Sequence, residues 1–347
     1  MTTRFFPCGA IALLLTTLCN GLPASVAATL DTALVPVPQE PGPAAKKKPV
    51  RVNYDLAKQL FGTEPAAPAA KVESSKEKVD LGKSLYEAKL GKAQQSCASC
   101  HDVAKYGQDG AVHDRNTLST VNAARHYAQF WDARAASVED AAVIAPKNGV
   151  EHGVGDEAEV LASLQASADL GKAFAAAFPG DANAVSVANF RVAIGAYLRT
   201  LVTKSKFDAY LDGDQKALSN DEKLGLKLFM DTGCITCHTT RLLGGHMIQK
   251  SGLLKPYPTE DTGRMRLSGS EADKGFFKVP TLLNVEKTAP YYHDGKVATL
   301  EDAVTHMADM QLNKQLPPDD VAAIVAFLKT LTGPLPGAID ARDEKKQ

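Results

Sequence analysis

Two short segments of the chain carry the same pattern of cysteine and histidine. They are "CASCH" at residues 97–101 and "CITCH" at residues 234–238. Two thiols at positions i and i+3, followed at once by an imidazole, form the pattern of covalent c-type haem attachment. The sulfurs form thioethers with the haem vinyl groups, and the adjacent histidine ligates the iron. The pattern predicts haem one on Cys97, Cys100 and His101, and haem two on Cys234, Cys237 and His238.

Two other uses of C-x-x-C pairs fit less well. A zinc site made from two such pairs usually has them about 15 to 20 residues apart, and these pairs lie much further apart. A thioredoxin-like redox pair requires a βαβ unit, and no segment around either motif indicates one. The sequence therefore favours haem at both motifs.

The remaining two cysteines, Cys8 and Cys19, lie in a segment typical of export signals. It contains Arg4, a short apolar run and small residues near Ala27. Residues 1–27 are predicted to be a signal peptide, with an uncleaved anchor as the alternative. A membrane span needs about 20 apolar residues, more than this run offers. Without the signal peptide, every remaining cysteine belongs to a haem motif.

The regions outside the haem units are rich in residues that do not build a core. Residues 28–75 are rich in Pro and Ala, which predicts a disordered tether. A short helix in "RVNYDLAKQLF" is the alternative for part of that stretch. Residues 335–347 are predicted to be a polar tail. The formal net charge of -1 gives no reason to expect a nucleic-acid partner.

The rest of the chain predicts a mainly α fold with an internal duplication. "VANFRVAIGAYLRTLV" and "DDVAAIVAFLKTLTG" have apolar residues at helical spacing. "NAARHYAQFWDARAASVEDA" at 122–141 lies without gaps on "NVEKTAPYYHDGKVATLEDA" at 284–303. We therefore expect two tandem cytochrome c-like haem domains, at residues 76–205 and 206–334.

The two copies differ after the shared "EDA". The second copy continues with His306, Met307 and Met310, whereas the equivalent part of the first has Ile144 and Ala145. A thioether ligand closes the iron coordination and raises its potential, which suits electron transfer. Haem two is therefore predicted to accept electrons, and haem one to present an open iron to a small molecule.

Two more residues are candidates for the chemistry at haem one. Glu151 follows the vacant ligand position, and a carboxylate there can move protons between the oxygens of a peroxide. A loop glutamate is also commonly a solvated surface residue. Trp131 is the only tryptophan and occupies the position of His293 in the second copy. It can relay electrons between the haems, pack in the core, or do both.

Four segments together resemble the bacterial dihaem cytochrome c peroxidases, the family that includes MauG-type enzymes. They are "RNTLSTVNAARHYAQFWDARA", "GCITCHTTRLLGG", "DKGFFKVPTLLNVEKTAPYYHDG" and "VTHMADMQLN". The resemblance covers nearly all of residues 80–333. It implies two haem domains face to face with calcium between them. It also implies a periplasmic homodimer that reduces hydrogen peroxide with electrons from a small cytochrome c or blue-copper protein (cupredoxin).

The resemblance also assigns roles to individual residues. Met307 falls on the methionine ligand of the electron-accepting haem, Trp131 on the inter-haem tryptophan and Glu151 on the active-site glutamate. The positions that supply calcium ligands in the family fall on Asn116, Thr288 and Pro290. Their oxygens are of the kind that calcium prefers.

The chain departs from the family pattern in the loop after the first motif. Many members have a histidine there that ligates haem one in the oxidised state and leaves on activation. The gapless position here is Gln108, and His113 lies five residues later. Either His113 takes that role, or haem one is open without activation, which we favour. His113 and His126 are otherwise expected to be surface histidines.

Two further functions compete with a peroxidase. A MauG-like oxidase would draw electrons from a protein or organic substrate, but that branch carries tyrosine where this chain has Met307. A plain dihaem electron carrier would need ligands on both irons. The apolar pair Ile144 and Ala145 disfavours the carrier unless His113 is a permanent ligand.

Overall fold

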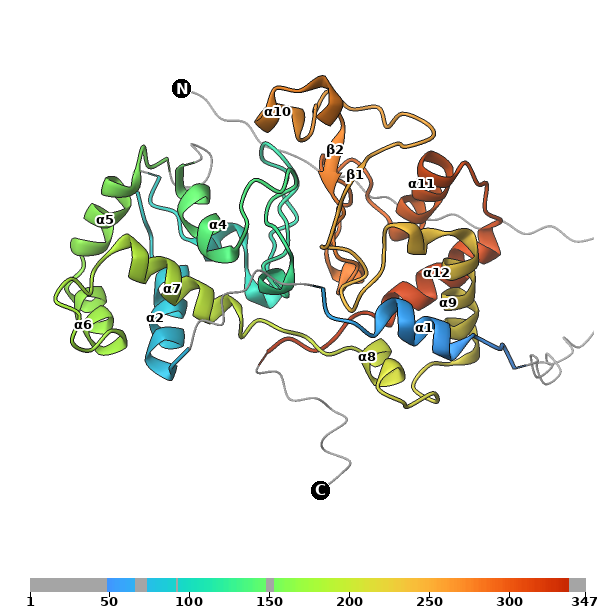
Figure 1. Cartoon of the computed structure of the whole chain (residues 1–347), viewed down its shortest axis with the longest axis horizontal. Helices are drawn as coiled ribbons and strands as arrows, with labels where there is room; N and C mark the ends of the chain where they lie inside the picture. The colour runs from blue at the N-terminus through green and yellow to red at the C-terminus, as the bar shows by residue number, and fades with distance from the viewer. Residues whose placement is uncertain (1–48, 66–73, 92, 148–152, 337–347) are drawn as a thin grey trace, which may run out of the picture. The chain divides into compact units, whose positions relative to one another are not determined.

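The computed structural model describes residues 49–65, 74–91, 93–147 and 153–336 (Figure 1). The predicted signal peptide, residues 28–48 and 66–73 of the predicted tether, and the tail from residue 337 lie outside the described residues. Helices make up most of the secondary structure, so the prediction of a mainly α fold is confirmed. No helix in the described ranges has the length and apolar character needed to cross a membrane.

Twelve α-helices and one small sheet make up the described chain. The helices are α1 (Tyr54–Phe61), α2 (Lys76–Glu87), α3 (Cys97–Cys100), α4 (Val138–Ile144), α5 (Glu157–Gln165), α6 (Ala168–Ala177), α7 (Val187–Leu198), α8 (Lys206–Leu211), α9 (Asn220–Thr232), α10 (Met265–Ser268), α11 (Leu300–Leu312) and α12 (Pro318–Lys329). The strands are β1 (Ile248–Lys250) and β2 (Phe276–Lys278). They pair antiparallel, with Ile248 opposite Lys278.

Short polar side chains set the starts of the main helices. Ser75, Ser186, Ser219 and Thr299 each accept a hydrogen bond from a backbone N–H in the first turn of α2, α7, α9 and α11. Such caps satisfy amides that have no partner within the helix. Helix α9 ends at Gly233, whose φ of 101° lies in the left-handed region that glycine tolerates. That turn delivers the chain directly into the second haem motif.

The duplication predicted from the sequence is present in the packing. In the first copy α2 crosses α7, and in the second α9 crosses α12 (Figure 1). A Cβ added to Gly82 would lie 2.0 Å from the Ala193 carbonyl oxygen, and one added to Gly225 would lie 1.9 Å from that of Ala323. Each crossing is therefore close enough that only glycine fits at the contact.

Each copy has its own hydrophobic cluster. The buried residues of one cluster all come from positions 81–201. Those of the other come from positions 207–331, with Ala57 and Phe61 added from α1. The domain boundary predicted at 205/206 falls in the interval between these clusters and stays a prediction.

Helix α1 corrects part of the predicted tether. Residues 49–65 are ordered against the second copy, where Ala57 and Phe61 are fully buried. The backbone of this segment also pairs, since the Leu60 carbonyl accepts from the Thr240 N–H at 2.9 Å. The tether prediction was wrong here because the apolar face of α1 finds a partner far away in sequence. The alternative of a short helix in this stretch is confirmed.

Equivalent asparagines of the two copies meet at one threonine. Asn122 and Asn284 both have left-handed backbones, with φ of 64° and 59°. Each donates from Nδ2 to the Thr203 hydroxyl oxygen at 3.0 Å. All three residues are buried, so the segment between the copies is fixed by interior hydrogen bonds.

A buried ion-pair network also joins the two copies. Arg115 donates to Asp132 at 2.9 Å and, through Nε, to Asp261 at 2.6 Å. Asp132 also accepts from Arg134. Burial alone would raise the pKa of Asp261, but the hydrogen bond and charge of Arg115 outweigh it, and that pKa is lowered.

Candidate functional site

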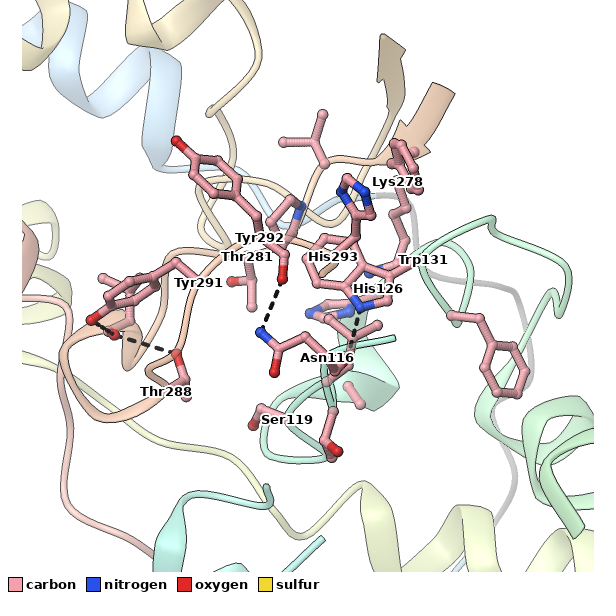
Figure 2. Close-up of a pocket in the computed structure, with 18 of the residues that line it drawn as sticks. Asn116, Ser119, His126, Trp131, Lys278, Thr281, Thr288, Tyr291, Tyr292 and His293 are labelled. Carbon is pink, nitrogen blue, oxygen red and sulfur yellow. Dashed lines mark hydrogen bonds between the residues drawn. The ribbon is translucent and has the colours of Figure 1, made fainter. Parts of the chain in front are cut away.

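Both C-x-x-C-H motifs line one continuous cavity of about 450 Å³. The walls come from both copies and include α4, α11 and the loops around residues 113–131 and 277–293, part of which is shown in Figure 2. All six predicted attachment and proximal residues lie on it: Cys97, Cys100, His101, Cys234, Cys237 and His238. The fold therefore places both motifs on the same cavity, although they lie more than a hundred positions apart in the sequence.

The two motif histidines have the orientation that an iron ligand needs. Nδ1 of His101 lies 3.2 Å from the Gly107 carbonyl oxygen, and Nδ1 of His238 lies 2.8 Å from that of Leu243. A carbonyl only accepts, so each ring carries its proton on Nδ1 and keeps a lone pair on Nε2. Burial lowers the pKa of both rings, to about 4 for His238. Both are therefore neutral, as ligation requires.

The motif cysteines have the character of attachment sites. All four are half-buried, and none forms a disulfide within the described chain. Cys97 and Cys100 lie on α3, Cys234 lies on the 3-10 turn Cys234–Thr236, and Cys237 follows that turn. Burial raises the pKa of Cys234 to about 12, whereas a reactive redox cysteine has a lowered pKa. No cluster of potential metal ligands in the described chain unites cysteines of both motifs. The residues fit covalent haem better than zinc or thiol redox chemistry.

The part of the cavity wall formed by α11 in one copy and by α4 in the other differs between the copies. Helix α11 presents Ala303, Val304, Met307 and Ala308 to the cavity; the end of α4 and the turn after it present Ala141, Ala142, Ala145 and Pro146. These two sets match position by position in the gapless register of the duplication. Ala145 therefore stands where the second copy has Met307.

The other two candidates for the thioether position are less suitably placed. His306 is exposed. Met310 is buried, but it is not part of the cavity wall, and its carbonyl accepts from the backbone of Leu254 and Lys255. Only Met307 of the three lines the cavity.

Trp131 is buried on the cavity wall between the two copies. Its indole Nε1 donates to the Asn116 carbonyl at 2.8 Å. Its ring lies edge-on to that of His293, with centroids 6.2 Å apart, and Figure 2 shows the two side by side. The duplication makes these residues equivalents, and the fold makes them neighbours.

Two of the three candidate calcium residues, Asn116 and Pro290, are in contact. Asn116 Nδ2 donates to the carbonyl oxygens of Pro290, at 2.6 Å, and Tyr292, at 3.0 Å (Figure 2). The Thr288 hydroxyl donates to the Val285 carbonyl. The donor set is all oxygen, as calcium prefers, if the Asn116 amide presents its oxygen instead of its nitrogen.

The loop after the first motif holds Gln108 and His113 differently. Gln108 is buried, and its Nε2 donates to the Lys287 carbonyl at 3.3 Å. The side chain of His113 is 38% exposed and its Nε2 lies 3.2 Å from an Asp109 oxygen. His113 also borders the cavity and groups with Cys100 and Asp109 within 4.8 Å. It is thus partly a surface residue, beside the first motif.

Glu151 lies outside the described residues. The chain on either side of that gap is fixed at the cavity. Pro146 forms part of its wall, and the Pro146 carbonyl accepts from the Val154 N–H at 3.0 Å. The role of Glu151 stays a prediction.

Two buried residues of the site were missed from the sequence. His126, expected on the surface, is 5% exposed and lines the cavity; that expectation was wrong because the loop folds inward. Lys278, at the end of β2, is 2% exposed and also lines it. The sequence feature that could have indicated Lys278 is a lone charge inside the apolar run "FFKVP".

The chain matches known proteins over both copies. Residues 76–216 match the model of the di-haem cytochrome c peroxidase family, and residues 222–332 match that of cytochrome c. The cytochrome c551 peroxidase of Nitrosomonas europaea is 39% identical, over 80% of this chain and 86% of that protein. The cytochrome c551 peroxidase of Pseudomonas aeruginosa is 41% identical, over 76% and 80%.

A solved structure agrees with these matches. A MauG-like protein associated with microbial copper homeostasis superimposes with a TM-score of 0.68 and 27% identity, over 78% of this chain and 93% of that one. The relatives and both family models support two haem c groups and an oxidoreductase that acts on peroxide. The chain belongs to the di-haem cytochrome c peroxidase family.

Proposed function

We propose that this peroxidase divides its work between the copies, with electron entry at haem two and peroxide reduction at haem one. The observation that carries this division is that Met307 and Ala145 line the cavity at equivalent positions of the two copies. When bound, haem iron supplies the redox chemistry. His238 and Met307 would hold the iron of haem two. His101 would hold that of haem one, and the small Ala145 leaves room for peroxide.

Side chains of the protein would then transfer the protons and electrons. Reduction of one hydrogen peroxide to two waters consumes two electrons and two protons. Glu151 would accept a proton from one peroxide oxygen and deliver it to the other. Trp131, fixed by its bond to Asn116, would provide the electron path between the copies. The aromatic contact of Trp131 with His293 supports a place on that path.

The surroundings of the enzyme follow from the same family membership. We place it in the periplasm after export by residues 1–27, as a homodimer that takes electrons from a small cytochrome c or cupredoxin. The names of its relatives support a cytochrome as the donor. A calcium ion bound near Asn116, Thr288 and Pro290 would tie the two copies together beside the haems.

The decisive experiment is peroxide-dependent oxidation of reduced cytochrome c by the haem-loaded protein, after haem two has been reduced. We expect rapid turnover that collapses in Glu151→Gln. Glu157→Gln, which changes an exposed carboxylate at the start of α5, is the matched control and should turn over normally. If no small cytochrome or copper protein supports turnover, the substrate is a protein or organic molecule, or the chain is a carrier.

The state of haem one needs a separate measurement. An electron paramagnetic resonance spectrum of the fully oxidised protein should contain a high-spin ferric signal if haem one is open. A purely low-spin spectrum that becomes partly high-spin in His113→Ala would instead make His113 a ligand. The position of His113 beside Cys100 makes this variant the informative one.

A further inference from the structure

Lys278 places a positive charge inside the haem cavity with no visible counter-charge. It is 2% exposed, and its backbone N–H donates to the Trp131 carbonyl at 2.6 Å. In Figure 2 its side chain lies with those of Trp131 and His126 on one side of the cavity. Within the described chain, no carboxylate or other acceptor bonds its ammonium group.

The nearby carboxylates are engaged elsewhere. Asp132 follows Trp131 directly, but it pairs with Arg115 and Arg134. An ammonium group removed from water costs several kcal/mol unless a partner compensates for the lost hydration. Burial accordingly lowers the pKa of Lys278 to about 8. A negatively charged group bound in the cavity would compensate for this cost.

His126 is a second polar group without a partner at the same place. Its Nε2 is buried and forms no hydrogen bond, and no described residue bonds its other ring nitrogen. Burial is the main cause of its lowered pKa, followed by the charges of Lys278 and Arg125. Arg125 is itself paired with Glu64. His126 is therefore neutral, with one N–H to donate.

We propose that Lys278 and His126 form a carboxylate-binding site that holds a propionate of one of the two haems. Haem c enters this cavity with two carboxylates, and they are its only ionised groups outside the iron. Hydrogen peroxide is neutral and needs no such partner. The lysine would supply a charge-assisted hydrogen bond, and the imidazole a neutral one. The site rests on haem binding alone, so it stands or falls independently of the proposed division of labour.

This pairing has an electrochemical consequence. A positive charge near a haem favours the reduced iron, which carries one positive charge fewer than the oxidised iron. Loss of the charge would also free the propionate to bind a proton when the iron is reduced. Lys278 would therefore keep the potential of that haem high and independent of pH.

The test is a spectroscopic redox titration of both haems in the holoenzyme, at several values between pH 5 and pH 8. In Lys278→Gln we expect one midpoint potential to fall, with the reduction equilibrium changing about tenfold, or about 59 mV for a one-electron couple. The same haem should acquire a pH-dependent potential. His126→Phe should shift the same haem by less. Lys278→Arg should keep the potential and its flat pH profile.

Lys206→Met is the matched control, because it removes a charge from the same copy outside the cavity, where Lys206 pairs with Glu222. It should leave both potentials unchanged. Unaltered potentials and pH profiles in a Lys278→Gln protein that carries both haems would overturn the proposal. If that variant loads haem poorly while Lys278→Arg loads both, the charge requirement is supported.

If neither lysine variant loads haem, the wild-type protein decides the matter. Redox-triggered infrared difference spectra of protein with 13C-labelled propionates report their protonation directly. We expect one propionate to remain ionised on reduction across this pH range. A labelled band of protonated carboxylic acid that appears for both propionates of each haem would refute the pairing.

Discussion

Ala145 and Met307 occupy equivalent places on the cavity wall, and under the proposed function this one thioether would distinguish an open iron from a closed one. We predict that Ala145→Met closes haem one, because the new sulfur would stand where Met307 stands in the other copy. Peroxide turnover should fall by at least about tenfold, which corresponds to about 1.4 kcal/mol of competing binding. Stopped-flow assays with peroxide and the loss of the high-spin signal would check this.

Ala142→Met is the control for that substitution. It adds the same side chain to the same wall of the cavity, at the position that Val304 holds in the second copy. If the Ala145→Met variant is folded, carries both haems and turns over as fast as wild type, this wall does not face the iron of haem one.

Asp261 should make the stability of the protein sensitive to acid. Its pKa is lowered in the folded state, so its contribution is present above its unfolded pKa of about 3.9 and is lost as the pH falls through the folded value. Asp261→Asn should cost about 3 kcal/mol at pH 7, because it leaves the buried Arg115 with one partner fewer. Thermal unfolding from pH 7 to pH 3 should show that difference shrinking with acid. A difference that is constant with pH would contradict the ion-pair account.

Only some residues of the site could be predicted from the sequence. The motif cysteines and histidines could be found because haem attachment needs fixed spacing within five residues. The duplication narrowed the candidates for the thioether position to His306, Met307 and Met310, and the family resemblance singled out Met307. The burial of His126 could not be predicted, since a single loop histidine has no pattern that indicates it, and the only signal for Lys278 was one charge inside the apolar run "FFKVP".

The helix crossings in each copy depend on close approach of two backbones. We predict that Gly82→Ala and Gly225→Ala each cost about 3 kcal/mol, because the new methyl group would overlap a carbonyl of the facing helix. Gly171→Ala in α6 is the matched control. A methyl group there meets nothing within 4 Å, so it should stabilise the helix by about 0.5–1 kcal/mol. Urea unfolding of the holoenzyme would compare the three variants, and equal effects at all three sites would contradict this packing argument.

Elements were predictable where the pattern was local. The mainly α class and the paired helices follow from apolar spacing within single segments. Helix α1 was harder to place, because the Pro- and Ala-rich composition around it indicates a tether. The residues that bury Phe61, such as Phe207 and Phe229, lie far along the chain. Whether this segment forms a helix or a tether therefore depends on a tertiary contact that local sequence does not indicate.

The hydrogen bonds at Thr203 are among the interior contacts that join the two copies. Thr203→Val keeps the shape of the side chain but removes the hydroxyl that accepts from Asn122 and Asn284. We predict a loss of about 3 kcal/mol, since two buried amides would lose an acceptor. Thr200→Val is the control, because its hydroxyl donates only to the nearby Tyr197 carbonyl. Chemical denaturation should show a larger loss in the free energy of unfolding for Thr203→Val than for Thr200→Val. A similar loss in both variants would contradict the special role of the Thr203 hydroxyl.

Thr203 also has a consequence for how such a chain can change over generations. Most positions in a duplicated protein exist twice, so one version is free to drift while its twin preserves the original task. The backbone at Thr203 has a twin in Gly333, since the N–H of each donates to the asparagine of its own copy, but Gly333 has no side chain to repeat the hydroxyl. A substitution that removes the Thr203 hydroxyl would therefore affect Asn122 and Asn284, and so both halves of the protein, at once.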